Sequence, residues 1–185
     1  ADQRVAWTEL DADSVQHHTP GLSDAYRFGI EVASGGHCRD PGAYVAGLVA
    51  LACARGAHRL AAHATGLAIE QGRLKAVRTS RGDLSADAVV ISAGIDSAAL
   101  ARQAGNRIPL ESERGYHVVL PTAGLAMKTP LMPSDGKMAV TLTRTGLRIS
   151  GQVELAGRHA PADWRRADVL VRHARRMFPA ARWPE

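Results

Sequence analysis

Residues 86–105, ADAVVISAGIDSAALARQAG, have the order of a strand, a glycine turn and a short helix. That order often places the backbone beside a nucleotide. Ala93 and Gly94 lie at the turn, and because Gly94 has no side chain, a flat cofactor group could approach the strand end closely. The alternative is a plain strand-to-helix turn. No GxGxxG phosphate loop occurs anywhere in the chain, so the site for a dinucleotide would be incomplete.

A second set of chemically useful residue types begins at RGYH, where Tyr116 and His117 are adjacent in a strand pattern and point to opposite faces. A phenol hydroxyl or an imidazole on the pocket side could orient an amino acid. The alternative is two half-buried strand residues with satisfied polar tips. Met138 and Val140 share one face of the next strand pattern, either as an apolar wall for a substrate side chain or as core. We predict all four as substrate-binding residues.

Other kinds of chemistry find little support in the sequence. No Ser-His-Asp set and no paired carboxylates stand out, so no catalytic residue is predicted. His17, His18, His37 and Cys38 could be combined into a zinc site, but their spacing is not diagnostic, and we predict no metal site. The two cysteines form no CxxC pair, which favours a reducing compartment.

The first element that must position these residues is a helix over Asp40–Gly56. Asp40 can cap its N-terminus, Pro41 suits its first turn and Gly56 suits its end. Apolar residues cover most of its circumference, so we expect it to be buried on more than one side.

Three strand patterns follow at short spacing, over Thr65–Glu70, Leu74–Thr79 and Ala86–Ala93. Gln71-Gly72 is typical of the turn in a two-residue hairpin, so the three strands predict an antiparallel meander. The third pattern is an almost continuous apolar run, which predicts a strand covered on both faces. A short helix over Ala98–Ala104 follows it.

The second half is richer in strands. Three strands are expected there. The last of these strands alternates apolar and polar residues, so we expect one face of its sheet to be polar and to face water or a wet pocket. A short helix near Asp11–Val15, and loops or an edge strand around Arg27–Ala33, are expected before the long helix. The three strands and the final helix are predicted over Gly115–Leu120, Met138–Arg144, Leu147–Val153 and Ala162–Phe178.

Composition is that of an ordinary globular protein, with 45% hydrophobic and 22% charged residues in 185. The net charge of +5 could indicate an anionic partner such as nucleic acid, or a solvated arginine-rich surface; because the charge is spread along the chain, we favour the second. No apolar run is long enough for a membrane span. The chain opens with Ala1, so we expect it to begin inside a longer gene product.

The ordered set of RDPGAYVAGL, a meander, VVISAG with a following serine, IPLESERGYHVVLP and WRRADVLVRHARRMFP resembles the D-amino-acid oxidase superfamily of flavoproteins. Within it, the likeness is to bacterial D-amino-acid dehydrogenases, from about His37 to Pro179. The resemblance implies an FAD cofactor that accepts a hydride from the substrate α-carbon. It implies adenine contact at Thr65, where related chains carry Val, and cofactor contact at Ala93 and Gly94. Asp96 stands where many related chains have Trp.

The resemblance also implies that this chain is an internal fragment, without the GxGxxG segment and without the later arginine that grips the substrate carboxylate. We therefore expect an α+β fold: a mixed or antiparallel substrate-binding domain from 1–39 and 106–185, and a partial FAD-binding domain from 40–105. The fragment is expected to be inactive, to lose FAD and to self-associate through exposed apolar faces. The expected partners are an amino-acid substrate and the remaining segments of the same enzyme, but not nucleic acid.

Two other functions stay open at this point: a basic module that binds nucleic acid or another anion, and a stand-alone structural remnant. We expect a cytoplasmic location, and the resemblance leaves open a peripheral position at the inner membrane.

Overall fold

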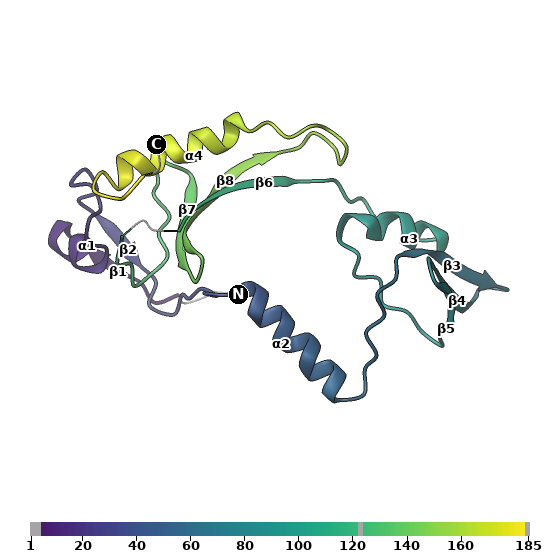
Figure 1. Ribbon diagram of the computed structural model, residues 1–185. Helices are drawn as coiled ribbons and strands as arrows, with labels where there is room; N and C mark the ends of the chain where they lie inside the picture. The colour runs from purple at the N-terminus through teal and green to yellow at the C-terminus, as the bar shows by residue number, and fades with distance from the viewer. Residues whose placement is uncertain (1–4, 122–123, 184–185) are drawn as a thin grey trace. The chain divides into compact units, whose positions relative to one another are not determined.

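The computed structural model describes residues 5–121 and 124–183 and shows an α+β fold built from three antiparallel sheets (Figure 1). The chain forms two compact units. The first unit contains Ala1–Leu48, Arg114–Glu154 and Ala160–Glu185, and the second contains Val49–Glu113 and Leu155–His159. The assignment of these parts to substrate and FAD binding stays a prediction.

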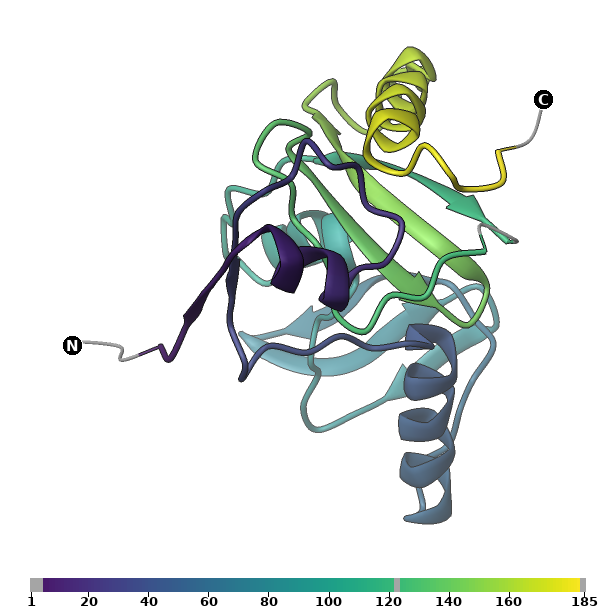
Figure 2. The same ribbon diagram turned by 90° about the vertical axis from the view of Figure 1, so that its left-hand side faces the viewer.

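The first unit is organised around a three-stranded sheet in the order β6–β8–β7, with every pair antiparallel. Its strands are β6 (Arg114–Leu120), β7 (Met138–Thr143) and β8 (Gly146–Glu154), close to the predicted bounds. Helix α4 (Arg165–Met177) runs along one face of the sheet (Figure 2).

The core of the first unit lies between this sheet and α4. Because side chains alternate along a strand, Leu147 and Ile149 point to the same face, where both are fully buried. Leu170 and Phe178 of the C-terminal segment pack against them, and Val15 of the N-terminal segment joins the same cluster. We refer to this as the core face of the sheet.

The N-terminal segment contributes a two-stranded ribbon and a helix to the first unit. Strands β1 (Thr8–Leu10) and β2 (Gly29–Glu31) pair antiparallel, and α1 (Ala12–His18) lies between them in sequence. Asp11 caps α1 by accepting a hydrogen bond from the Ser14 amide at 2.9 Å. The predicted short helix is confirmed, and of the two alternatives for Arg27–Ala33 the structure has the strand β2, whereas β1 was not predicted.

A β-bulge changes the side-chain alternation near the end of β8. Gly115 pairs with Val153 but Tyr116 pairs with Gly151, so Gln152 is the extra residue and has a φ of +59°. Val153 is consequently 48% exposed, and the alternation that predicted it beside Leu147 is wrong at this residue.

The second unit contains the predicted meander of β3 (Ala64–Glu70), β4 (Arg73–Thr79) and β5 (Gly82–Ser85). Gln71 and Gly72 both have positive φ, as the predicted hairpin turn requires. A 3-10 turn, η1 (Gly94–Asp96), leads into α3 (Ser97–Gln103).

The third predicted strand is wrong in position. Residues 82–85 pair with β4 as β5, while residues 86–93 belong to no strand. Val90 is 87% exposed, so the predicted cover on both faces of this apolar run is also absent from the described residues. Its pattern is typical of a buried strand, but it pairs with none of the described strands.

Helix α2 (Pro41–Ala54) lies within the predicted range Asp40–Gly56 and has the predicted cap, because the Asp40 carboxylate accepts a hydrogen bond from the Ala43 amide at 2.9 Å. The predicted burial is wrong: no residue of α2 is buried, and Tyr44 is 63% exposed. Its apolar circumference has no cover from the described elements. Across the described part of the chain, no helix combines the length and apolar character needed to cross a membrane.

Candidate functional site

The predicted cofactor residues all lie in the second unit, where α3 is fixed to the edge strand β3. The Leu67 amide donates a hydrogen bond to Oε1 of Gln103 at 2.8 Å. A Cβ on Gly66 would lie 2.9 Å from the same oxygen, so a side chain at this position would require the flexible Gln103 side chain to shift. The contact positions the turn before α3 beside the meander.

At that turn, both Ala93 and Gly94 are exposed. The Ala93 amide donates a hydrogen bond to Oγ of Ser97 at 3.0 Å, which holds the start of η1. Gly94 has a φ of +56°, and a Cβ built on it would meet no described atom within 4 Å. The backbone therefore presents an open side that a flat group could approach.

Thr65 lies at the start of β3, where the pairing with β4 skips it between Ala64 and Gly66. Its side chain is exposed, and Oγ1 donates a hydrogen bond to the Arg78 carbonyl at 3.3 Å. Because the hydroxyl is used within the sheet, only the backbone of Thr65 is well placed for an adenine contact.

An open pocket of about 320 Å³ connects the beginning of β3 with this turn. Its lining contains small and aliphatic residues and one serine, without a basic group: Ala64, Leu67, Val77, Val89, Val90, Ile91, Ser92, Ala93 and Leu100. Such a lining fits the edge of an aromatic ring system. It does not suit a pyrophosphate, which requires cationic groups or free backbone N–H groups.

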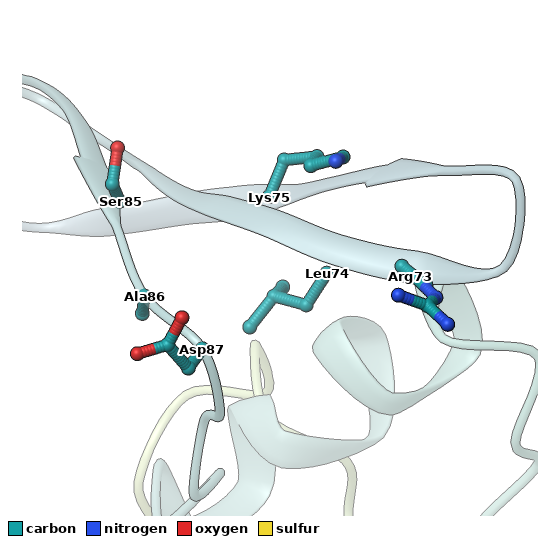
Figure 3. Close-up of a pocket in the computed structure, with 6 residues that line it drawn as sticks. All are labelled: Arg73, Leu74, Lys75, Ser85, Ala86 and Asp87. Carbon is teal, nitrogen blue, oxygen red and sulfur yellow. The ribbon is translucent and has the colours of Figure 1, made fainter.

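A second open pocket, of about 490 Å³, lies at the other end of the meander and involves none of the predicted site residues (Figure 3). Lys75 and Ser85 point to one side of β4, whereas Leu74 and Asp87 point to the other. These groups do not converge on a common point, so we assign no binding role to this pocket.

In the first unit, Tyr116 is buried on the core face, and its hydroxyl has two partners. It donates to Glu154, and it accepts a hydrogen bond from the Asp163 amide at 2.8 Å. The β8 bulge makes this possible by turning Glu154, whose side chain is 13% exposed, toward Tyr116. Trp164 lies edge-to-face with the Tyr116 ring at 6.0 Å.

Arg114 completes this network. Its guanidinium donates to Glu154 at 3.1 Å and to the carbonyls of Ala160 and Pro161 at 2.6 and 3.1 Å. The nearby Tyr116 hydroxyl and, after it, the negative charge of Glu154 raise the pKa of Arg114. The network ties the ends of β6 and β8 to the segment that leads into α4.

The other predicted substrate residues fall on two different faces of the sheet. Met138 and Val140 are buried with Tyr116 in the core cluster, which favours the core alternative for both. His117 points to the opposite face and is exposed. The structure therefore does not bring the four together, and a substrate-binding role for them stays a prediction.

We call the face that carries His117 the open face of the sheet. On it, His117 pairs with Ser150 and Val119 pairs with Arg148 across β6 and β8. Ala139 and Thr141 of β7 flank the same two residues of β8; neither side chain is fully buried. Sequence reasoning singled out neither Arg148 nor Ser150, although the alternation in β8 predicted a polar face.

The sequence profile of the family described as FAD dependent oxidoreductase matches residues 2–185. A D-amino-acid oxidase of Bradyrhizobium diazoefficiens is 45% identical over 175 residues, which cover 95% of this chain and 42% of that protein. A D-amino acid dehydrogenase of Cereibacter sphaeroides is 32% identical, over 96% of this chain and 42% of that protein. The chain thus spans less than half the length of these curated relatives.

Solved structures give the same fold. The L-proline dehydrogenase from P. horikoshii matches with a TM-score of 0.78 at 18% identity, over 96% of this chain and 49% of that one. A glycine oxidase from Bacillus cereus matches with a TM-score of 0.75 at 20% identity, over 99% of this chain and 52% of that one.

Proposed function

Because this chain belongs to the family of FAD-dependent oxidoreductases, we propose that it forms part of an enzyme that oxidises D-amino acids by hydride transfer to the flavin. The observation that carries this proposal is the 45% identity, over 95% of the chain, to a D-amino-acid oxidase.

Two parts of the chain have separate roles in the proposal. The open face of the β6–β8–β7 sheet contacts the substrate, because it presents an imidazole, a hydroxyl and a guanidinium without a covering element among the described residues. The beginning of β3 and the Ala93–Gly94 turn contact the adenine end of FAD, because the apolar pocket there admits a flat ring edge.

When bound, FAD supplies the hydride acceptor, and the protein supplies binding and orientation. Within this chain, the Tyr116–Glu154–Arg114 network fixes the sheet relative to the segment before α4. Since the Tyr116 hydroxyl is occupied within that network, His117 is the better placed of the two adjacent residues to contact a substrate.

The pyrophosphate of FAD has no site among the residues described above. A charged diphosphate needs several hydrogen bonds to backbone N–H or cationic groups, each contributing about 1.5–3 kcal/mol. We propose that segments equivalent to the uncovered part of the relatives supply them. The 185-residue chain by itself should therefore retain no FAD and oxidise no D-amino acid.

A hybrid enzyme tests the proposal directly. This chain replaces the 175-residue matching region of the Bradyrhizobium oxidase, and the hybrid is compared with the 185-residue chain. We expect flavin absorbance and D-amino-acid-dependent dye reduction in the hybrid, and neither in the chain alone. A folded hybrid that retains flavin but oxidises no D-amino acid contradicts the proposed substrate class. Tight stoichiometric flavin in the chain alone contradicts the proposed division of the FAD site.

A further inference from the structure

We propose that Lys137 and Gln152, at one end of the β7–β8 pair, bind the side chain of the substrate and favour D-amino acids whose side chain carries a carboxylate. The inference rests on the proposed function for the identity of the ligand as an amino acid. It depends on the geometry of one sheet within the first unit.

Both residues have a backbone conformation that side chains rarely adopt. Among the described residues other than glycine, only Gln71, Lys137 and Gln152 have a positive φ, with values of +51°, +44° and +59°. Gln71 lies in the hairpin turn of the second unit. The other two are neighbours, because they directly flank Met138 and Gly151, the pair that ends the β7–β8 ladder. Conformations of this kind concentrate at ligand sites.

The backbone fixes this conformation without help from the two side chains. A Cβ on Gly151 would lie 3.0 Å from the Lys137 carbonyl oxygen and 3.2 Å from the Cα of Met138, so the two strands approach closely here. Gln152 is the extra residue of the bulge against β6. Glycine would adopt either conformation without the steric cost of a Cβ. The fold itself therefore requires neither the lysine nor the glutamine side chain.

The functional groups of both side chains are available to a ligand. Neither the Lys137 ammonium nor the Gln152 amide has a hydrogen bond or an ion pair with any described residue. The acidic residues nearest to them along the chain have other partners, because Asp135 is bonded to Tyr26 and Glu154 to an arginine. An ammonium group donates three hydrogen bonds and an amide two. Together they suit a carboxylate, which binds charged donors more strongly than neutral ones.

The position of the two residues suits the side chain of a substrate better than its α-carbon. Ser150 precedes Gln152 by two residues on β8, and His117 pairs with Ser150. Two residues of a strand span about 7 Å. An amino acid whose α-carbon lies beside His117 therefore needs a side chain of two or three carbons to reach Lys137. D-Glutamate has such a side chain with a terminal carboxylate, whereas the methyl group of D-alanine is too short.

The hybrid enzyme measures this selectivity as kcat/KM at constant ionic strength. We expect D-glutamate to be the best substrate of three, followed by D-glutamine, which has the same length without the charge, and then D-alanine. Lys137→Met keeps the length of the side chain and removes its charge. It should lower kcat/KM for D-glutamate at least about fivefold and for D-alanine less than about twofold. Lys137→Arg should keep most of the preference, because it keeps the charge.

Glycine substitutions separate binding from folding. Lys137→Gly and Gln152→Gly should leave the melting temperature of the 185-residue chain unchanged or raise it by up to about 4 °C, because they relieve the positive φ. Both should lower the preference for D-glutamate. Gln71→Gly is the matched control, because it relieves a similar φ in the other unit. It should shift the melting temperature in the same way and leave the preference unchanged.

Amide chemical shifts of the isotope-labelled 185-residue chain test the site without flavin. D-Glutamate should produce saturable shifts at Lys137 and Gln152 with an affinity in the millimolar range. Lys137→Met should lose these shifts, and D-alanine should not produce them.

Several results would overturn the inference. One is an equal loss of kcat/KM for D-glutamate and D-alanine in Lys137→Met, which would mean that Lys137 contacts a group common to all amino acids. Others are no preference for D-glutamate over D-glutamine in the unchanged hybrid, no saturable shifts with D-glutamate, or melting temperatures that fall in both glycine variants. The last result would mean that the two side chains serve the fold.

The two proposals can fail separately. Oxidation of D-amino acids with the same preference in Lys137→Met as in the unchanged hybrid would reject the side-chain site and keep the proposed function. Shifts with D-glutamate that depend on Lys137, without oxidation by a flavin-loaded hybrid, would keep the site and reject the function.

Discussion

At the scale of single residues, the hydroxyl of Tyr116 connects three parts of the first unit. It bonds to Glu154 on β8 and to the amide of Asp163 before α4, while its ring packs in the core. Tyrosine is needed here because phenylalanine would fill the same space but leave a largely buried carboxylate and an amide without this partner.

We therefore expect Tyr116→Phe to lower the free energy of unfolding by about 1–3 kcal/mol, the cost of leaving buried polar groups unsatisfied. Urea unfolding followed by circular dichroism measures the change. Tyr44→Phe is the control, because Tyr44 is 63% exposed and should change stability little. Equal effects in the two variants would contradict the role of the network.

A second tyrosine gives a pH dependence. The Tyr26 hydroxyl donates to the carboxylate of Asp135 at 3.0 Å, and burial, followed by this hydrogen bond, raises the pKa of Tyr26 to about 12. Between pH 10 and 12 the unfolded chain releases this proton while the folded chain keeps it, so stability falls as the pH rises through this window.

Urea unfolding at several values from pH 9 to 12 should show this fall in the unchanged chain and in Tyr44→Phe. In Tyr26→Phe the fall should be smaller, because the group that titrates differently in the two states is gone. If stability declines equally steeply with pH in Tyr26→Phe, the pH dependence does not come from Tyr26.

At the scale of elements, the β7–β8 hairpin depends on the glycine that opens β8. Gly146 has a φ of +127°, and a Cβ there would lie 2.3 Å from the Leu120 carbonyl oxygen and 2.6 Å from the Cα of Pro121. Both contacts are to backbone, which cannot move aside as a flexible side chain can.

Gly146→Ala should therefore destabilise the first unit by more than about 2 kcal/mol, among the larger effects of single substitutions. Thermal unfolding measures the loss. Gly157→Ala is the control, because Gly157 also has a positive φ but open space around a built Cβ. Similar melting temperatures for the two variants would show that the close contact with β6 relaxes at little cost.

The turn before α3 gives the corresponding prediction for the cofactor. In the hybrid enzyme, Gly94→Val should lower flavin retention, because a side chain would occupy the open side of the turn. Strain at the positive φ should cost about 1–3 kcal/mol of stability as well.

Gly72→Val separates the two effects. Gly72 has a φ of +74° and equally open space, but lies at the β3–β4 hairpin turn. Its substitution should cost similar stability and leave flavin content unchanged. If Gly94→Val retains the same flavin content as Gly72→Val, the turn does not contact the cofactor.

At the scale of the whole molecule, apolar surface is the dominant feature. All residues of α2 are exposed, and that helix carries no charged residue. Exposed apolar patches of this kind favour association.

We expect the 185-residue chain to form concentration-dependent oligomers in sedimentation experiments. Leu48→Lys with Leu51→Lys should reduce them, because two charges would interrupt the apolar surface of α2. Arg172 on α4 is exposed and charged, unlike the partly buried Val169 of the same helix. Arg172→Gln therefore serves as a control that should leave association unchanged. A monomer at all concentrations would contradict the prediction.

The sequence by itself determined the elements whose signals are local. Turn residues such as Gln71-Gly72, the Asp40 cap and the period-two alternation of β8 predicted β3, β4, α2 and the β7–β8 hairpin close to their observed bounds. These features depend on neighbours within a few residues, so no distant contact is needed to fix them.

Only the tertiary structure decided features that depend on a distant partner. The run over residues 86–93 has the composition of a buried strand but pairs with no described strand, and residues 82–85 take the place beside β4 as β5. The predicted burial of α2 is wrong for the same reason, because an apolar circumference indicates that a helix needs cover but not whether a cover is present.

The candidate site shows the same division. Alternation placed Tyr116 and His117 on opposite faces but did not say which face the core would occupy. The packing of α4 and the bulge at Gln152 decided that Tyr116 and Glu154 turn inward, and that His117, Ser150 and Arg148 remain on the open face. A bulge inserts one residue into one strand only, and its position is set by the pairing across strands.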